Sequence, residues 1–150
     1  MRDKFDTSLK DAMRARDKRR VATLRLIMAA IKDRDIDARG AGREEISDAD
    51  ILALLQKMVK QREESAKIYA EAGRDELAEQ EREEIAIIEE FLPQPLSEQE
   101  VGAAIEAAIG ATGAESLRDM GKVVAELKAK YPGRIDFGQA AKLVKQKLGA

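Results

Sequence analysis

Apolar residues recur along most of this chain at the spacing of an α-helix, and polar residues fill the positions between them. The clearest stripe is formed by Val21, Leu24, Ile27, Met28 and Ile31. No stretch alternates apolar and polar residues as a half-buried strand does. The pattern predicts an all-α protein, with helices over residues 2–16, 18–38, 47–72, 77–92, 97–110, 116–131 and 136–148.

Capping residues stand where two of these helices are expected to begin. Ser47 with Asp50, and Ser97 with Glu100, have the spacing of a capping box, in which each side chain accepts a hydrogen bond from the other residue's backbone N–H. At the far end of the helix that starts at Ser47, Gly73 suits the left-handed conformation that ends many helices.

The segment PQPL at residues 93–96 interrupts the helical pattern. Its two prolines cannot sit inside a helix, and each favours an extended conformation for the residue before it. We therefore expect an N-terminal helical domain over residues 1–92, a proline hinge over 93–96 and a small three-helix domain over 97–150.

The composition excludes several kinds of active site. The 150 residues include no Cys and no His, so the chain lacks a thiol nucleophile and the commonest general base and metal ligand. No segment is long and apolar enough for a signal peptide or a membrane span. We expect a cytoplasmic protein with no cofactor, no metal, no membrane partner and no catalytic residue, and its oligomeric state stays open.

Charge is distributed unevenly along the chain, although the net charge is only −2. Residues 1–45 carry +4, residues 46–95 carry −7 and residues 117–150 carry +5. Such asymmetry is informative about partners rather than about fold. It is compatible with polyanion binding by the basic ends and equally with contact between the acidic and basic parts.

Basic and very small residues share one face of the helix predicted over 116–131. A helical wheel predicts a buried stripe of Leu117, Met120, Val124, Leu127 and Tyr131. Another face carries Arg118, Gly121, Lys122, Ala125 and Ala129. A phosphate backbone can approach such a low basic surface closely. Alternatively, Gly121 lets another helix pack tightly there, because a helical glycine costs up to about 1 kcal/mol and needs a reason.

Further cations continue this basic surface. On the last helix, Lys142 and Lys145 are predicted to lie opposite an inward face of Phe137, Ala140, Ala141, Val144 and Leu148. Attraction of cations to a helix C-terminus is the alternative explanation for these lysines. With only 3% aromatic residues, recognition of folded RNA by shape and backbone is expected rather than base stacking. The candidate RNA-binding residues are Arg118, Gly121, Lys122, Lys128, Lys130, Arg134, Lys142 and Lys145.

Two other charged clusters carry weaker predictions. The segment RARDKRR at residues 14–20 is either a solvated, ion-paired surface or a second RNA or partner contact. The glutamates between residues 76 and 90 do not predict a di-metal centre, because helix-bundle centres of that kind pair glutamate with histidine.

Four segments resemble the YqeY-like proteins, and together they cover nearly the whole chain. They read TLRLIMAAIK, EAGRDELAEQEREEIAIIEEFLP, EEFLPQPLSEQE and DMGKVVAELKAKYPGRIDFGQAAKLVKQKL. The part from about residue 96 onward is also similar to the tail domain of the B subunit of aspartyl/glutamyl-tRNA amidotransferase. The resemblance implies a helical domain followed by a compact tail domain, which in the amidotransferase helps to hold tRNA while other parts perform the amide chemistry.

Three functions remain open from the sequence. The leading hypothesis is a non-catalytic protein that binds tRNA or associates with a tRNA-handling complex such as the amidotransferase. The second, implied by the resemblance alone, is a carbon–nitrogen ligase with glutamine as amido donor. The third is a helical protein–protein adaptor without an RNA role.

Overall fold

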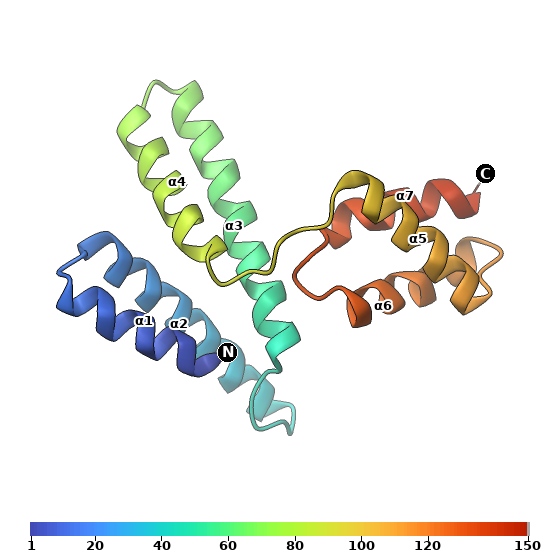
Figure 1. Cartoon of the computed structure of the whole chain (residues 1–150), viewed down its shortest axis with the longest axis horizontal. Coiled ribbons are helices and arrows are strands. Elements are labelled where there is room, and N and C mark those ends of the chain that lie inside the picture. Colours follow the sequence, from blue (N-terminus) through green and yellow to red (C-terminus); the bar gives the residue numbers. More distant parts are fainter. Residues whose placement is uncertain (150) are drawn as a thin grey trace. The chain divides into compact units, whose positions relative to one another are not determined.

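The computed structural model describes residues 1–149, which form helices and connecting loops and contain no strand. The prediction of an all-α protein is confirmed. Within these residues, none of the helices is long and apolar enough to cross a bilayer. The helices are α1 (Arg2–Arg14), α2 (Lys18–Gly40), α3 (Asp48–Glu71), α4 (Asp75–Glu89), α5 (Glu98–Thr112), the short 3-10 helix η1 (Leu117–Asp119), α6 (Met120–Lys130) and α7 (Phe137–Gly149) (Figure 1).

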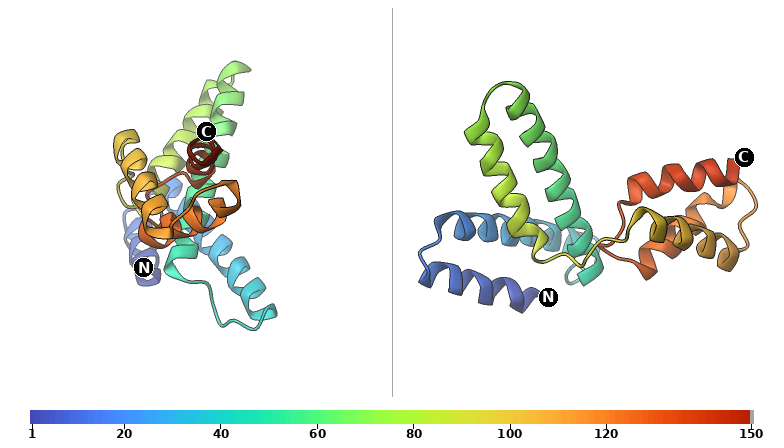
Figure 2. Two further views of the ribbon diagram at one scale, coloured as in Figure 1. Left: turned by 90° about the vertical axis from the view of Figure 1, so that its right-hand side faces the viewer. Right: turned by 45° about the horizontal axis from the view of Figure 1, so that its top comes forward.

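The chain divides into two compact units, an N-terminal unit over Met1–Leu92 and a C-terminal unit that begins at Pro93. In the N-terminal unit α1 packs on α2, α3 packs on α4 as an antiparallel hairpin, and α2 packs on α4 (Figure 2). The predicted stripe of α2 supplies Leu24, Ile27 and Ile31 to the core. The rings of Phe5 and Phe91, whose centroids are 4.7 Å apart, join the two ends of this unit's sequence.

An ion pair fastens the start of α1 to α2 and to the loop before α3. Two guanidinium nitrogens of Arg2 donate to the two carboxylate oxygens of Asp35, each at 2.9 Å. The backbone N–H of Ile46 donates to the same carboxylate at 2.9 Å. The hydrogen bond from Arg2, followed by that from Ile46, lowers the pKa of Asp35 to about 2.

A second ion pair lies inside the α3–α4 hairpin. Nε of Arg62 donates to Glu84 at 3.1 Å, and only 15% and 10% of the two side chains are exposed. Arg62 also donates to the backbone carbonyl of Met58 at 3.2 Å. A buried carboxylate is tolerated here because its charge is paired.

The predicted capping residues are confirmed, although several helices end at other residues than predicted: α4, for example, spans Asp75–Glu89 rather than 77–92. In both capping boxes, Ser47 with Asp50 and Ser97 with Glu100, the two reciprocal hydrogen bonds are present. Gly73 follows α3 with a φ of +74°, the left-handed conformation expected of it.

In the C-terminal unit α6 packs against both α5 and α7. Its buried core consists of Ala104, Ile105, Ala108, Val123, Leu127, Ile135, Ala140 and Val144. Small and β-branched residues predominate in this core.

The buried stripe predicted for residues 116–131 is confirmed at Leu127, and Met120 and Tyr131 pack against the same core, but two of its positions are wrong. Val123 rather than Val124 is fully buried, and Leu117, predicted to face inward, is 49% exposed. Leu117 lies in η1, outside the α-helix, which begins only at Met120. Within α6, Val123 joins Leu127 on the buried face.

Candidate nucleic-acid interface

The predicted RNA-binding face of α6 lies in solvent. Arg118 of η1 and Gly121, Lys122, Ala125 and Ala129 of α6 are all exposed. A Cβ built on Gly121 meets no atom within 4 Å. Within the described residues, no helix packs against this glycine, so no packing contact offsets its destabilising effect on the helix.

The lysines of this face have weak carboxylate partners. Nζ of Lys122 lies 3.7 Å from Asp119, and Nζ of Lys130 lies 3.3 Å from Glu126. Hydrogen bonds from the backbone N–H groups of Glu115 and Ser116 lower the pKa of Asp119, and Lys122 adds to the effect. Both lysine side chains are more than half exposed, so solvent screens these pairs and a phosphate can compete for the ammonium groups.

Lys128 points to a different side of α6. At about 100° per residue, Lys130 lies about 80° around the helix from Lys122, whereas Lys128 lies about 120° away in the other direction. Nζ of Lys128 is 5.9 Å from the centre of the Phe137 ring on α7. This cation–π contact links α6 to α7.

Arg134 has a structural role that the sequence did not reveal. It lies in the loop between α6 and α7, where its Nε donates to the carbonyl of Gln94 at 2.9 Å. In return, the N–H of Leu96 donates to the carbonyl of Arg134 at 2.9 Å. We call this pair of hydrogen bonds the linker clasp, because it holds residues 94–96 against the C-terminal unit.

The lysines of α7 differ in their surroundings. Lys142 and Lys145 are exposed, and no ion pair of either is recorded in the described part of the chain. Lys147 donates to Glu106 of α5 at 2.9 Å, which lowers the pKa of that carboxyl group. Helix α7 contains no Asp or Glu, so its own charge is entirely positive.

The predicted residues therefore separate into two basic faces and two structural contacts. The α6 basic face comprises Arg118, Gly121, Lys122 and Lys130, and the α7 basic face comprises Lys142 and Lys145. Lys128 and Arg134 serve packing and the linker clasp. All eight residues belong to the C-terminal unit, and chemically the two faces offer exposed cations to phosphate groups.

In the N-terminal unit, RARDKRR is largely an ion-paired surface. Nε of Arg19 donates to Glu83 at 3.2 Å, and Arg20 donates to Glu90 through two nitrogens. The side chain of Asp17 accepts from the N–H of Arg20 and so caps α2. These contacts favour the structural interpretation of the cluster over the RNA contact.

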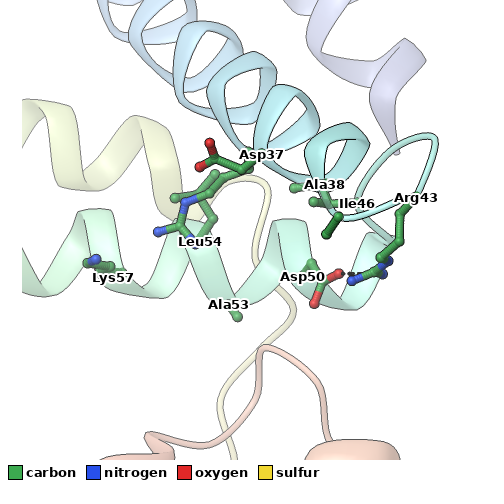
Figure 3. A pocket seen from close by; sticks show the side chains of 10 residues that line it. Asp37, Ala38, Arg43, Ile46, Asp50, Ala53, Leu54 and Lys57 are labelled. Carbon is green, nitrogen blue, oxygen red and sulfur yellow. Dashed lines mark hydrogen bonds and ion pairs between the residues drawn. The ribbon is translucent and has the colours of Figure 1, made fainter.

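A hollow of about 600 Å³ lies between the end of α2, the following loop and the start of α3 (Figure 3). Its charges are mixed: Arg34, Arg43 and Lys57 line it together with Asp37 and Asp50, and Arg43 lies beside Asp50 (Figure 3). Arg43 donates to Asp50 at 3.4 Å, and Asp50 already accepts from the N–H of Ser47. Charges of both signs give the hollow no clear ligand preference.

The glutamates of α4 are engaged or dispersed. Glu83, Glu84 and Glu90 pair with Arg19, Arg62 and Arg20, respectively. Burial raises the pKa of Glu81, and the charge of Glu84 adds to the effect. Across residues 1–149, no cluster of three or more potential ligands could hold a metal ion.

Known proteins resemble this chain over most of its length. The protein "Altered inheritance of mitochondria protein 41, mitochondrial" of Lachancea thermotolerans is 37% identical to this chain over 99 residues. The match covers 65% of this chain and 51% of that protein. The proteins with the same name in Meyerozyma guilliermondii and Pyrenophora tritici-repentis are 31% identical over 136 residues and 25% identical over 150 residues. These matches cover 91% and 98% of this chain and 64% and 80% of those proteins.

The chain thus spans about half the length of the first of these relatives. A family profile described as "Yqey-like protein" matches residues 2–148, which include both helical units and both basic faces. The segments that first suggested this resemblance all fall inside the matched range. The chain belongs to the YqeY-like protein family.

Proposed function

We propose that this protein binds folded RNA, with tRNA as the first candidate, through the α6 and α7 basic faces. It would act within a tRNA-handling process without performing the chemistry. The observation that carries the proposal is Gly121: a glycine in the first turn of α6, beside Arg118 and Lys122, with nothing packed against it. Its absent side chain lets a phosphate backbone reach the helix surface between two cations.

The aromatic residues support recognition of folded rather than single-stranded RNA. Phe5 and Phe91 are buried in the N-terminal core, and Phe137, Tyr69 and Tyr131 are each partly covered. None of the five is an exposed platform on which a base could stack. Contacts to phosphates and to the shape of a helix remain the available mode.

The test is fluorescence anisotropy of labelled bulk tRNA with the full chain at several salt concentrations. Binding in the range of about 10⁻⁴–10⁻⁶ M, with log K falling linearly against log salt, is expected if three to five phosphates are neutralised. The triple variant Lys122→Glu, Lys142→Glu and Lys145→Glu should abolish it. Reversal of Lys10, Lys32 and Lys67, three exposed lysines of the N-terminal unit, is the matched control and should retain most of the binding.

Failure of the wild-type chain to bind tRNA at low salt would overturn the proposal. Release of ammonia from glutamine, or amide transfer, by the purified chain alone would instead establish the carbon–nitrogen ligase alternative. That reaction would need a nucleophile other than a thiol, because the chain contains no Cys.

The cytoplasm is the compartment we propose for this activity. The fungal relatives are named as mitochondrial proteins. Immunodetection in fractionated cells of the source organism distinguishes a cytoplasmic from an organellar protein. Enrichment in an organelle fraction would refute the proposed cytoplasmic location.

A further inference from the structure

The C-terminal unit contains an open groove of about 730 Å³ between α5, α7 and the segments that precede them. We call it the α5–α7 groove. Its apolar lining comes from Leu96, Val101, Ile105, Ile135, Ala140 and Leu143. Leu143 is 40% exposed, so part of this lining is in contact with water. An apolar concavity of this kind is typical of a binding groove rather than of a solvated surface.

A glycine in the wall strengthens this interpretation. Gly102 lies in the interior of α5, lines the groove, and has no atom within 4 Å of the position that a Cβ would take. Glycine lowers helix stability relative to alanine, and here no packing within the described residues requires it. A ligand backbone can therefore approach α5 closely at this point.

Charge around the groove indicates the kind of ligand. Along α7 the groove is lined by Lys142 and by Lys147, and Lys147 is paired with Glu106. The carboxylates of the lining, Glu98 and Asp136, lie where α5 and α7 begin. A ligand that is apolar in the middle and acidic where it faces the two lysines complements this distribution.

An amphipathic helix has this chemistry, and a nucleic acid does not. The floor is aliphatic and offers no aromatic ring on which a base could stack. Helices bind such grooves by placing apolar side chains at i, i+3, i+4 and i+7 against the floor. We propose that the α5–α7 groove binds one acidic amphipathic helix of a partner protein, with the helix backbone passing closest to α5 at Gly102. This goes beyond the proposed RNA binding, although Lys142 belongs both to the groove lining and to the α7 basic face.

The probe is a fluorescein-labelled peptide of about 16 residues, with leucine at the i, i+3, i+4 and i+7 positions and glutamate elsewhere. Binding to the full chain is followed by anisotropy and by methyl NMR shifts of Val101, Ile105 and Leu143. Saturable binding that shifts these methyl groups is expected. The same peptide with lysine in place of glutamate should bind at least tenfold more weakly.

Gly102→Leu should weaken peptide binding at least tenfold, because the new side chain occupies the groove. Gly110→Leu is the matched control: Gly110 lies in the same helix, also has open space at its Cβ position, and does not line the groove. Gly102→Ala provides a milder variant that should fold at least as well as the wild type and still reduce affinity. Circular dichroism verifies folding of each variant.

Three results would overturn the proposal: no methyl shifts at millimolar peptide, equal binding by Gly102→Leu and wild type, or stronger binding of the lysine peptide. Groove shifts that depend on protein concentration without peptide would also overturn it, because a second copy of the chain would then be the occupant. If the chain binds the peptide but not tRNA, the proposed RNA binding is refuted and the groove proposal stands. The Gly102→Leu variant should bind tRNA as the wild type does.

Discussion

Replacing Gly121 by alanine separates the stability of α6 from its proposed use as a contact surface. Gly121 is not among the glycines with positive φ, so alanine can adopt its helical backbone without strain. The new methyl group enters open space, since no atom lies within 4 Å of the Cβ position. The substitution therefore removes the entropic disadvantage of glycine without introducing a clash.

The expected gain in the free energy of unfolding is at most about 0.5–1 kcal/mol, the difference between glycine and alanine in a helix interior, because Gly121 lies in the first turn of α6. For a unit of this size, such a gain raises the melting temperature by roughly 2–6 °C. If a phosphate backbone contacts the α6 surface at Gly121, the same methyl group should weaken tRNA binding several-fold. Stability and affinity are thus expected to change in opposite directions.

The assay combines scanning calorimetry, hydrogen exchange of the α6 amides and tRNA anisotropy on the full chain. Gly110→Ala is the matched control, because it should stabilise α5 by a similar amount and leave tRNA binding unchanged. Unchanged tRNA affinity in a stabilised Gly121→Ala variant would refute close approach at this position. Loss of stability would refute the more basic claim that the space beside Gly121 is empty.

Three further predictions concern interactions that each lie inside one of the two units. Folding lowers the pKa of Asp35 from its ordinary value of 3.8 to about 2. The charged Asp35 therefore contributes its full stabilisation above about pH 4, and this stabilisation is lost as the pH falls towards 2. Urea unfolding of the wild type and of Asp35→Asn at pH 7, 4 and 3 should show that their difference in the free energy of unfolding becomes smaller as the pH falls. Arg62→Met should lower the free energy of unfolding by about 2–3 kcal/mol by leaving Glu84 buried without its partner, and Glu84→Leu added to it should recover part of that loss in the same titration. Ser97→Ala should destabilise the C-terminal unit by about 1 kcal/mol through loss of a helix cap, seen as faster hydrogen exchange at the start of α5 with little change in α3.

Local signals in the sequence predicted the helices and their caps. The two hydrogen bonds of the capping box at Ser47 and Asp50 lie within one helical turn, so the sequence separation of these two residues is enough to predict them. The buried stripe predicted for residues 116–131 was right at Leu127 and wrong at two positions: Leu117 lies in η1, outside the α-helix, and Val123 is buried in place of Val124.

The long-range contacts could not be predicted in this way. Arg2 and Asp35 are 33 positions apart, and Arg134 and Gln94 are 40 apart. Nothing in the spacing of the charged residues distinguishes Arg134 from the lysines around it, which is why it was assigned to RNA binding. The exposure of the α6 face could be predicted, since it follows from the amphipathic pattern, whereas the α5–α7 groove depends on how three helices pack.

The linker clasp has a consequence for ligands that bind both units at once. Phe91 and Leu92 are hydrogen-bonded to the end of α4, and the clasp fixes Gln94 and Leu96, so the tether between the units is reduced to the few bonds around Pro93. A short tether keeps the second binding site at a high effective concentration once the first is occupied. Avidity for a large partner that contacts both units would then depend on Arg134 through the linker clasp, because loss of this residue would lengthen the tether and lower the effective concentration.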